Sequence, residues 1–154
     1  MVAEVSEARN NKAVELGADV VIDPMEESVV ERVKELTDGE GAEHSFDAAG
    51  IQETLQTALH STRKGGNVTI ISIWEGPVQI NPNDIVLAEL NVQGTICYTP
   101  EDFADTISML KDGSIKTEGI ITERIPLSDI VKGGFEELVD HKDRHVKILV
   151  NSAE

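Results

Sequence analysis

The first acidic residue of the chain, Glu4, has the position of a nucleotide-binding carboxylate. It follows the short apolar pair Val2-Ala3 and precedes a helical pattern over residues 7–16. Dinucleotide-binding folds place a carboxylate between a strand and a helix, where it accepts hydrogen bonds from the hydroxyls of the adenosine ribose. The same negative charge repels the 2′-phosphate of NADP. A surface glutamate at a strand end accounts for the spacing at least as well, so the pattern leaves both interpretations open.

The other reactive side chains do not have the spacing of a catalytic motif. The segment Gly39-Glu40-Gly41 lacks the third glycine of G-x-G-x-x-G, and the chain has no Walker loop, no G-x-S-x-G and no H-E-x-x-H. His141 and His145 are four residues apart but straddle the junction before the last predicted strand, which favours solvated surface histidines. Cys97 lies in an apolar run, which favours a buried, inert thiol. Among 29 acidic residues close carboxylate pairs arise by chance, so we predict no catalytic residue and no metal ligand.

The charge balance of the chain argues against two classes of partner. Its 154 residues include 13 Lys plus Arg and 29 Asp plus Glu, which gives a net charge of −16. Nucleic-acid binding needs a basic face that releases counterions from phosphates, and anionic membranes attract basic segments. We therefore expect neither nucleic acid nor membrane as a partner. The apolar runs are too short for a bilayer span, and the opening residues lack the charged-then-apolar pattern of a leader. With a single cysteine as well, we expect a cytoplasmic protein.

Hydrophobic periodicity alternates between strands and helices along the chain. This alternation is typical of βαβ units with a parallel sheet. The predicted strands are residues 19–23, 45–49, 67–73, 92–98, 120–125 and 146–150, and the predicted helices are residues 7–16, 26–36, 51–59, 103–110 and 128–139. Gly65-Gly66 is expected to end the third helix. Gly133-Gly134 predicts a break or a close packing contact in the last one, because each glycine costs a helix about 1 kcal/mol relative to alanine.

Short segments along the chain match a known family in order and spacing. They are Ser6-Glu7-Ala8-Arg9 after Glu4, Leu16-Gly17-Ala18-Asp19 before Val21-Ile22-Asp23-Pro24, Phe46-Asp47-Ala48-Ala49-Gly50, and Lys64-Gly65-Gly66. With them, residues 2–150 resemble the C-terminal part of zinc-dependent medium-chain alcohol and polyol dehydrogenases. The segments Ile73-Trp74-Glu75-Gly76-Pro77 and Asp143 to Val150 most resemble the butanediol dehydrogenase branch of that family, with sorbitol-type enzymes next.

The resemblance implies an NAD site, and four of its residues would hold the adenosine half of the cofactor. Glu4 matches the acid that binds the ribose and favours NAD over NADP. Arg9 matches a basic position that contacts the edge of the ribose. Ala49 and Gly50 match the turn that passes near the adenine.

Five further residues would hold the nicotinamide half, again as the resemblance implies. Ile71, Ser72 and Ile73 match the strand end beside the nicotinamide. Backbone groups of Thr95 and Cys97 match those that receive its carboxamide. For Ile71 and Ile73 a plain role in the strand core is an equally good interpretation, because one residue can serve both purposes.

The fold that the resemblance implies is α/β: an incomplete Rossmann-type, doubly wound parallel sheet plus the C-terminal segment of a catalytic domain. The first strand and the Gly-rich turn of the sheet are absent from the chain. Residues 1–96 are expected to form a partial NAD-binding domain, and residues 97–154 a return segment toward the absent catalytic domain. In the order 3-2-1-4-5-6 the absent strand is central, so its two neighbours would each have an unpaired edge. We therefore predict that the chain alone is marginally stable or pairs with another chain.

The activity that the resemblance implies is hydride transfer between a secondary alcohol or diol and NAD. Zinc would polarise the alcohol oxygen, but its ligands belong to the absent domain, so the chain alone is expected to be inactive. The intact enzyme is expected to bind a small-molecule alcohol or diol. It is also expected to form a homodimer or homotetramer, with residues 78–92 helping to form the subunit interface.

Two other classes of protein share parts of this pattern. A non-catalytic, nucleotide-binding regulatory domain would have a similar sheet, but it would keep its glycine-rich turn, and residues 120–150 follow the dehydrogenase ending. A receiver domain is suggested by Asp23 and Asp47 at strand ends, but residues 67–73 lack the lysine that it needs. NADH binding without turnover would favour the regulatory domain, and labelling by acetyl phosphate would favour the receiver.

Overall fold

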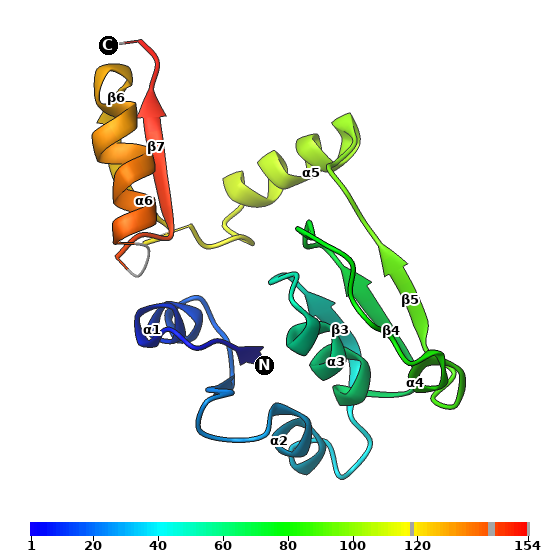
Figure 1. The fold of residues 1–154 in the computed structure, drawn as a ribbon. Helices are drawn as coiled ribbons and strands as arrows, with labels where there is room; N and C mark the ends of the chain where they lie inside the picture. Colours follow the sequence, from blue (N-terminus) through cyan, green and yellow to red (C-terminus); the bar gives the residue numbers. More distant parts are fainter. Residues whose placement is uncertain (118, 142–143, 154) are drawn as a thin grey trace. The chain divides into compact units, whose positions relative to one another are not determined.

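The computed structural model describes residues 1–117, 119–141 and 144–153 (Figure 1). These residues group into two compact units, Ile22–Tyr98 and Met1–Val21 with Thr99–Glu154. Within the described ranges, no helix is both long enough and apolar enough to cross a lipid bilayer. Asp143, the first residue of the last segment that carries the family resemblance, lies outside the described residues.

A three-stranded parallel sheet forms the centre of the unit Ile22–Tyr98 (Figure 1). The elements of this unit in chain order are α2 (Val29–Glu35), β3 (Ala42–Asp47), α3 (Gln52–Ser61), β4 (Thr62–Ile70), α4 (Pro82–Val86) and β5 (Asn91–Gly94). The strands lie in the order β3-β4-β5. Their register pairs Asp47 with Ile70 and Val68 with Val92. Helix α3 forms the crossover that parallel neighbours such as β3 and β4 require.

The core of this unit forms where α3 packs on the sheet. Leu55, Ala58 and Leu59 of α3 are buried together with Val68 of β4 and Leu90. The spacing of the three helical residues puts them on one face, because residues three and four apart lie on the same side of a helix. The helix predicted from this periodicity is therefore confirmed.

The predicted end of that helix is wrong. Helix α3 ends at Ser61, and β4 begins at the next residue, so Gly65-Gly66 lies within the strand and not at the end of the helix. A Cβ at Gly66 would lie 2.5 Å from Thr62 Cγ2 and 3.0 Å from the Glu43 oxygen. Gly66 is thus needed for the close approach of β4 to β3, which also shifts register between Ala42 and His44, whereas a Cβ at Gly65 would meet nothing within 4 Å.

The second unit contains elements from both ends of the chain. Its elements in chain order are β1 (Val2–Ala3), α1 (Glu7–Glu15), α5 (Pro100–Lys111), β6 (Ile121–Pro126), a 3₁₀ turn (Leu127–Asp129), a π-helical turn (Ile130–Glu136), α6 (Glu137–Asp140) and β7 (Lys147–Asn151). Strand β6 pairs in parallel with β7, and β1 pairs with β2 (Val21–Ile22), whose two residues lie on either side of the boundary between the units. The backbone N–H of Val2 donates to the Val20 oxygen at 2.9 Å.

The glycine pair in the last helical segment interrupts the α-helix as the sequence predicts. Residues 130–136 form a π-helical turn between a 3₁₀ turn and α6. Gly134 is buried there, and a Cβ on it would lie 3.2 Å from Ile125 Cδ1 of β6. Both parts of the prediction are confirmed, because the helix changes its hydrogen bonding and also packs closely on the neighbouring strand.

Several predicted strands are shorter in the structure. The strand predicted over 19–23 is reduced to β2, and the one predicted over 92–98 ends at Gly94. Cys97 has a left-handed backbone with φ of 57° and its side chain is exposed. The prediction of a buried thiol in a strand is therefore wrong, because the chain has already left the sheet at this residue.

The strands of the described residues fall into separate sheets. β1-β2 shares no ladder with β3-β4-β5 in the ranges that the structure describes. The α/β architecture with parallel strands confirms the predicted fold class.

Candidate functional site

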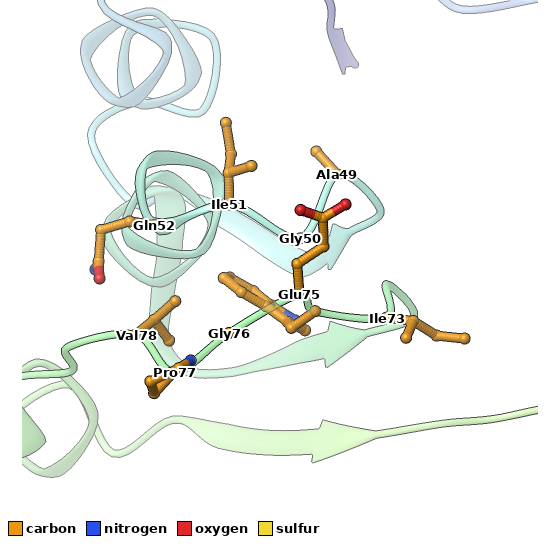
Figure 2. Close-up of a pocket in the computed structure, with 10 residues that line it drawn as sticks. Ala49, Gly50, Ile51, Gln52, Ile73, Glu75, Gly76, Pro77 and Val78 are labelled. Atoms are coloured by element: carbon orange, nitrogen blue, oxygen red, sulfur yellow. The ribbon is translucent and has the colours of Figure 1, made fainter. Parts of the chain in front are cut away.

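A pocket of about 440 Å³ opens at the carboxyl ends of β3 and β4 (Figure 2). One wall is the turn between β3 and α3, and the other is the loop that follows β4. The pocket is lined by Ala49, Gly50, Ile51, Gln52, Ile73, Trp74, Glu75, Gly76, Pro77 and Val78. Ligands of open α/β sheets bind at this end of parallel strands, because the loops there diverge and leave a crevice.

Three of the residues predicted to bind the cofactor line this pocket, namely Ala49, Gly50 and Ile73. Gly50 has φ of +72°, and a Cβ on it would lie 3.1 Å from Ser72 Cβ and 3.2 Å from the Ile73 oxygen. A side chain at position 50 would therefore push the two walls apart. The turn and the loop come this close only because the residue is glycine.

Ile71, Ser72 and Ile73 follow β4, which ends at Ile70. The Ile73 side chain is 83% exposed, and Ile71 is also exposed. Neither residue therefore belongs to the strand core, and that interpretation of the two isoleucines is wrong. In Figure 2 the Ile73 side chain points away from Gly76 and Pro77.

A buried carboxylate joins the two walls of the pocket. Asp47, the last residue of β3, is only 2% exposed, and its Oδ2 accepts a hydrogen bond from the Ser72 hydroxyl. Its backbone oxygen accepts from the Ile71 N–H at 2.9 Å and from the Ser72 N–H at 3.2 Å. Sequence reasoning noted Asp47 only as a strand-end acid and did not find this contact, because 25 residues separate Asp47 from Ser72.

A glutamine side chain attaches the loop to α3. Gln52 Nε2 donates to the Gln79 backbone oxygen at 2.7 Å, and the Gln79 N–H donates to Gln52 Oε1 at 2.8 Å. The amide thus forms the same two hydrogen bonds that a neighbouring strand would form. The sequence patterns did not predict a role for Gln52 either. The one signal that could have indicated it is its position in the first turn of a helix that follows the predicted site turn Ala49-Gly50.

Glu4 and Arg9, the two residues predicted to hold the ribose, form an ion pair in the other unit. Arg9 Nε donates to Glu4 Oε2 at 2.8 Å, and Arg9 Nη2 donates to Oε1 at 2.9 Å. The Ser6 N–H also donates to Oε1 at 2.9 Å. The hydrogen bonds from Arg9 hold the pKa of Glu4 below its ordinary value of 4.5. Glu4 is therefore a fixed negative charge at neutral pH.

The last two predicted residues follow β5. The Thr95 N–H donates to the Ile70 oxygen at 3.0 Å, which extends the pairing with β4 by one residue. Cys97 lies beyond it in the left-handed turn described above. Glu4 and Arg9 belong to the unit Met1–Val21 with Thr99–Glu154, and the other seven predicted positions belong to the unit Ile22–Tyr98.

The histidines and strand-end acids have structural contacts. The His145 side chain is only 11% exposed, with Nε2 3.3 Å from Glu137 Oε1 and Nδ1 3.3 Å from Thr122 Oγ1, so its prediction as a solvated residue is wrong. Asp23 Oδ1 accepts from the Met25 N–H at 2.8 Å, which is a turn contact. In the described ranges, no group of three His, Cys, Asp or Glu residues could hold a metal ion.

A pocket at the carboxyl ends of parallel strands, with a helix that begins at its edge, defines a ligand-binding domain of the doubly wound α/β class. A sequence model described as zinc-binding dehydrogenase matches residues 1–112. The chain belongs to this family. The family assignment made from short segments is thereby confirmed.

Curated proteins similar to the chain include dehydrogenases from bacteria, yeast and archaea. The chain is 41% identical over 152 residues to the (R,R)-butanediol dehydrogenase of Neisseria gonorrhoeae, and the aligned region covers 98% of this chain and 43% of that protein. It is 38% identical over 148 residues to the enzyme of the same name from Bacillus subtilis, with 96% and 42% covered. An L-threonine 3-dehydrogenase of Pyrococcus furiosus is 32% identical over 138 residues, with 88% and 40% covered. The chain spans less than half the length of these relatives.

Solved structures show the same relationship. The 2R,3R-butanediol dehydrogenase from Bacillus subtilis is similar with a TM-score of 0.89 and 37% identity, covering 97% of this chain and 42% of that one. The alcohol dehydrogenase of Thermus sp. ATN1 is similar with a TM-score of 0.86 and 26% identity, covering 97% and 43%. These similarities confirm the dehydrogenase branch that the segments at 73–77 suggested.

Proposed function

We propose that the chain is the NAD-binding part of a zinc-dependent oxidoreductase that transfers hydride between a secondary alcohol or diol and NAD. One observation carries this proposal: the lining of the pocket at the ends of β3 and β4 includes Ala49, Gly50 and Ile73, which the family resemblance assigns to the cofactor. The two relatives named butanediol dehydrogenase support a diol as the substrate class.

Glu4 supports NAD over NADP in this proposal. Its carboxylate is ionised, and Arg9 holds both oxygens in one orientation. An ionised carboxylate accepts hydrogen bonds from ribose hydroxyls and repels a 2′-phosphate. Arg9 would contact the edge of the ribose from its position beside the Glu4 carboxylate. The remaining assigned residues, Ile71, Ser72, Thr95 and Cys97, would contact the nicotinamide half.

Zinc belongs to a different part of the proposed enzyme. The residues described in this structure do not fit a zinc centre, since they contain no cluster of three suitable ligands. In the proposal, residues outside this chain hold the metal and the alcohol. Residues 1–96 supply the cofactor domain, residues 97–154 return toward the catalytic domain, and the chain alone is inactive.

An assembly of two or four subunits in the cytoplasm completes the proposal. Strand β5 lies at one edge of its sheet, and all four of its residues are exposed. Val86 and Leu87, in the same stretch as the predicted interface 78–92, are exposed as well. An unpaired edge beside exposed apolar residues favours association with a second copy.

Binding of NADH to the 154-residue chain tests the proposal. Trp74, the one tryptophan of the sequence, lines the pocket, and its emission overlaps the absorption of NADH. We expect saturable quenching by NADH and at least about tenfold weaker binding of NADPH, since like charges disfavour the 2′-phosphate. A folded chain that binds neither nucleotide would overturn the proposal. Binding without any turnover of diols in the whole protein would instead favour the regulatory domain.

A further inference from the structure

Asp47 has no role in the proposed hydride transfer, yet its carboxylate is almost completely buried. Burying a carboxylate is costly unless the group makes specific contacts. One oxygen, Oδ2, accepts from the Ser72 hydroxyl, while the other, Oδ1, is buried without a hydrogen-bond partner in the described residues. Oδ1 therefore loses its contact with water without gaining a hydrogen bond, and the specific contact of this side chain is the bond from Ser72 to Oδ2.

Asp47 makes three hydrogen bonds to two consecutive residues of the pocket loop. Its backbone oxygen binds the N–H groups of Ile71 and Ser72, and its side chain binds the Ser72 hydroxyl. The backbone bonds continue the β3–β4 pairing and would form with any residue at position 47. Only the side-chain bond depends on the aspartate, so this bond is the one that a substitution can remove selectively.

Ser72 transmits this constraint to the pocket. A Cβ at position 50 would lie 3.1 Å from Ser72 Cβ and 3.4 Å from Ser72 Oγ, so Gly50 and Ser72 are in close contact. Gly50 and Ile73, the residue after Ser72, both line the pocket. A change in the position of Ser72 therefore changes the distance between the two walls.

We propose that Asp47 is a positioning residue that acts through Ser72 and sets the width of the pocket between the turn Ala49–Gly50 and the loop Ile71–Ile73. The identity of the nucleotide in this inference rests on the proposed function. The positioning of Ser72 by Asp47 does not rest on the proposed function, because it concerns the free protein. Asp47 thus determines nucleotide affinity without touching the nucleotide.

A hydroxyl contact between β4 and β3 provides a matched control. Thr62 Oγ1 donates to Ser45 Oγ at 2.7 Å, which joins β4 to β3 away from the residues that line the pocket. Ser45→Ala removes a side-chain hydrogen bond from this sheet, as Ser72→Ala does. A general loss of stability would affect Ser45→Ala and Ser72→Ala alike. A loss of positioning would affect only Ser72→Ala.

The experiment compares Asp47→Ala, Asp47→Asn, Ser72→Ala and Ser45→Ala in the 154-residue chain. Trp74 lies two residues after Ser72 and packs against the core cluster, so its emission reports on the loop in the free protein. We expect Asp47→Ala and Ser72→Ala to shift this emission to the red, to increase its quenching by acrylamide, and to weaken NADH binding about tenfold. Asp47→Asn keeps an oxygen that accepts from Ser72 and should retain most of the affinity. Ser45→Ala should match the wild type in both measurements.

A double variant distinguishes positioning from two independent effects. Asp47→Ala with Ser72→Ala should bind NADH no more weakly than Asp47→Ala alone, because both substitutions remove the same contact. Additive losses, or wild-type emission and affinity in Ser72→Ala, would overturn the inference. If Asp47→Ala does not fold, Ser72→Ala and Asp47→Asn still decide the matter. If the wild-type chain binds no NADH, the proposed function fails, while the Trp74 measurements still test the positioning.

Discussion

Arg9 holds both carboxylate oxygens of Glu4, with Nε 2.8 Å from Oε2 and Nη2 2.9 Å from Oε1. A guanidinium that binds a carboxylate through two parallel hydrogen bonds fixes its orientation as well as its charge. Glu4 is thus held in one orientation before any ligand arrives. Its charge, its orientation and its effect on stability can each be measured.

The first prediction concerns stability against pH. Because Arg9 lowers the pKa of Glu4 in the folded state, the pair stabilises the fold above the ordinary pKa of 4.5. This stabilisation is lost as the pH falls through the lowered pKa. Arg9→Gln should therefore reduce the free energy of unfolding by about 0.5 kcal/mol at pH 7, since the pair is partly solvated, and by less at pH 3. Urea unfolding at the two pH values measures this, and an equal loss at both would contradict it.

The second prediction concerns the choice between nucleotides. Glu4→Gln removes the charge that repels a 2′-phosphate and releases Arg9 from its ion pair, so the affinity for NADPH relative to NADH should rise about tenfold or more. Glu7→Gln is the matched control, because Glu7 is an exposed acid in the first turn of α1. Titrations with both nucleotides give the ratio. A ratio that changes equally in the two variants would show that only net charge matters.

The third prediction concerns the Gln52–Gln79 contact. Gln52→Ala removes two hydrogen bonds that join the pocket loop to α3, and it should lower the free energy of unfolding by about 1–2 kcal/mol. The freed loop should also expose Trp74 to acrylamide. Gln56→Ala, an exposed position on the same helix, should change neither quantity. Equal quenching of Trp74 in the two variants would mean that the loop does not depend on Gln52.

The fourth prediction concerns Gly50. Gly50→Ala places a Cβ 3.1 Å from Ser72 Cβ at a left-handed backbone conformation, so it should destabilise the fold by about 1–2 kcal/mol and abolish nucleotide binding. Gly76→Ala is the matched control in the opposite wall, because nothing lies within 4 Å of a Cβ at that position. Thermal unfolding and NADH titration of both variants test the difference. Unaltered binding in Gly50→Ala would show that the walls need not approach closely.

The amino-acid sequence alone determined the features that depend on neighbours along the chain. The stripe of Leu55, Ala58 and Leu59 predicts helix α3, because helical periodicity is set by backbone geometry within a few residues. The glycine pair at 133–134 predicts the interruption of the last helix, because the cost of glycine in a helix is also a local property of the backbone. The order of short segments was sufficient for the family and for the α/β class.

The tertiary structure decided the contacts between distant residues. Asp47 meets Ser72 across 25 residues and Gln52 meets Gln79 across 27, and both contacts depend on the register of β3 with β4 and on the course of the loop. It also decided that Gly66 lies within β4 and that Cys97 is exposed after the sheet has ended. Such features arise from packing and strand register, which local residue patterns do not encode. The sequence thus located the parts of the candidate site, and only the folded chain showed how Asp47 connects them.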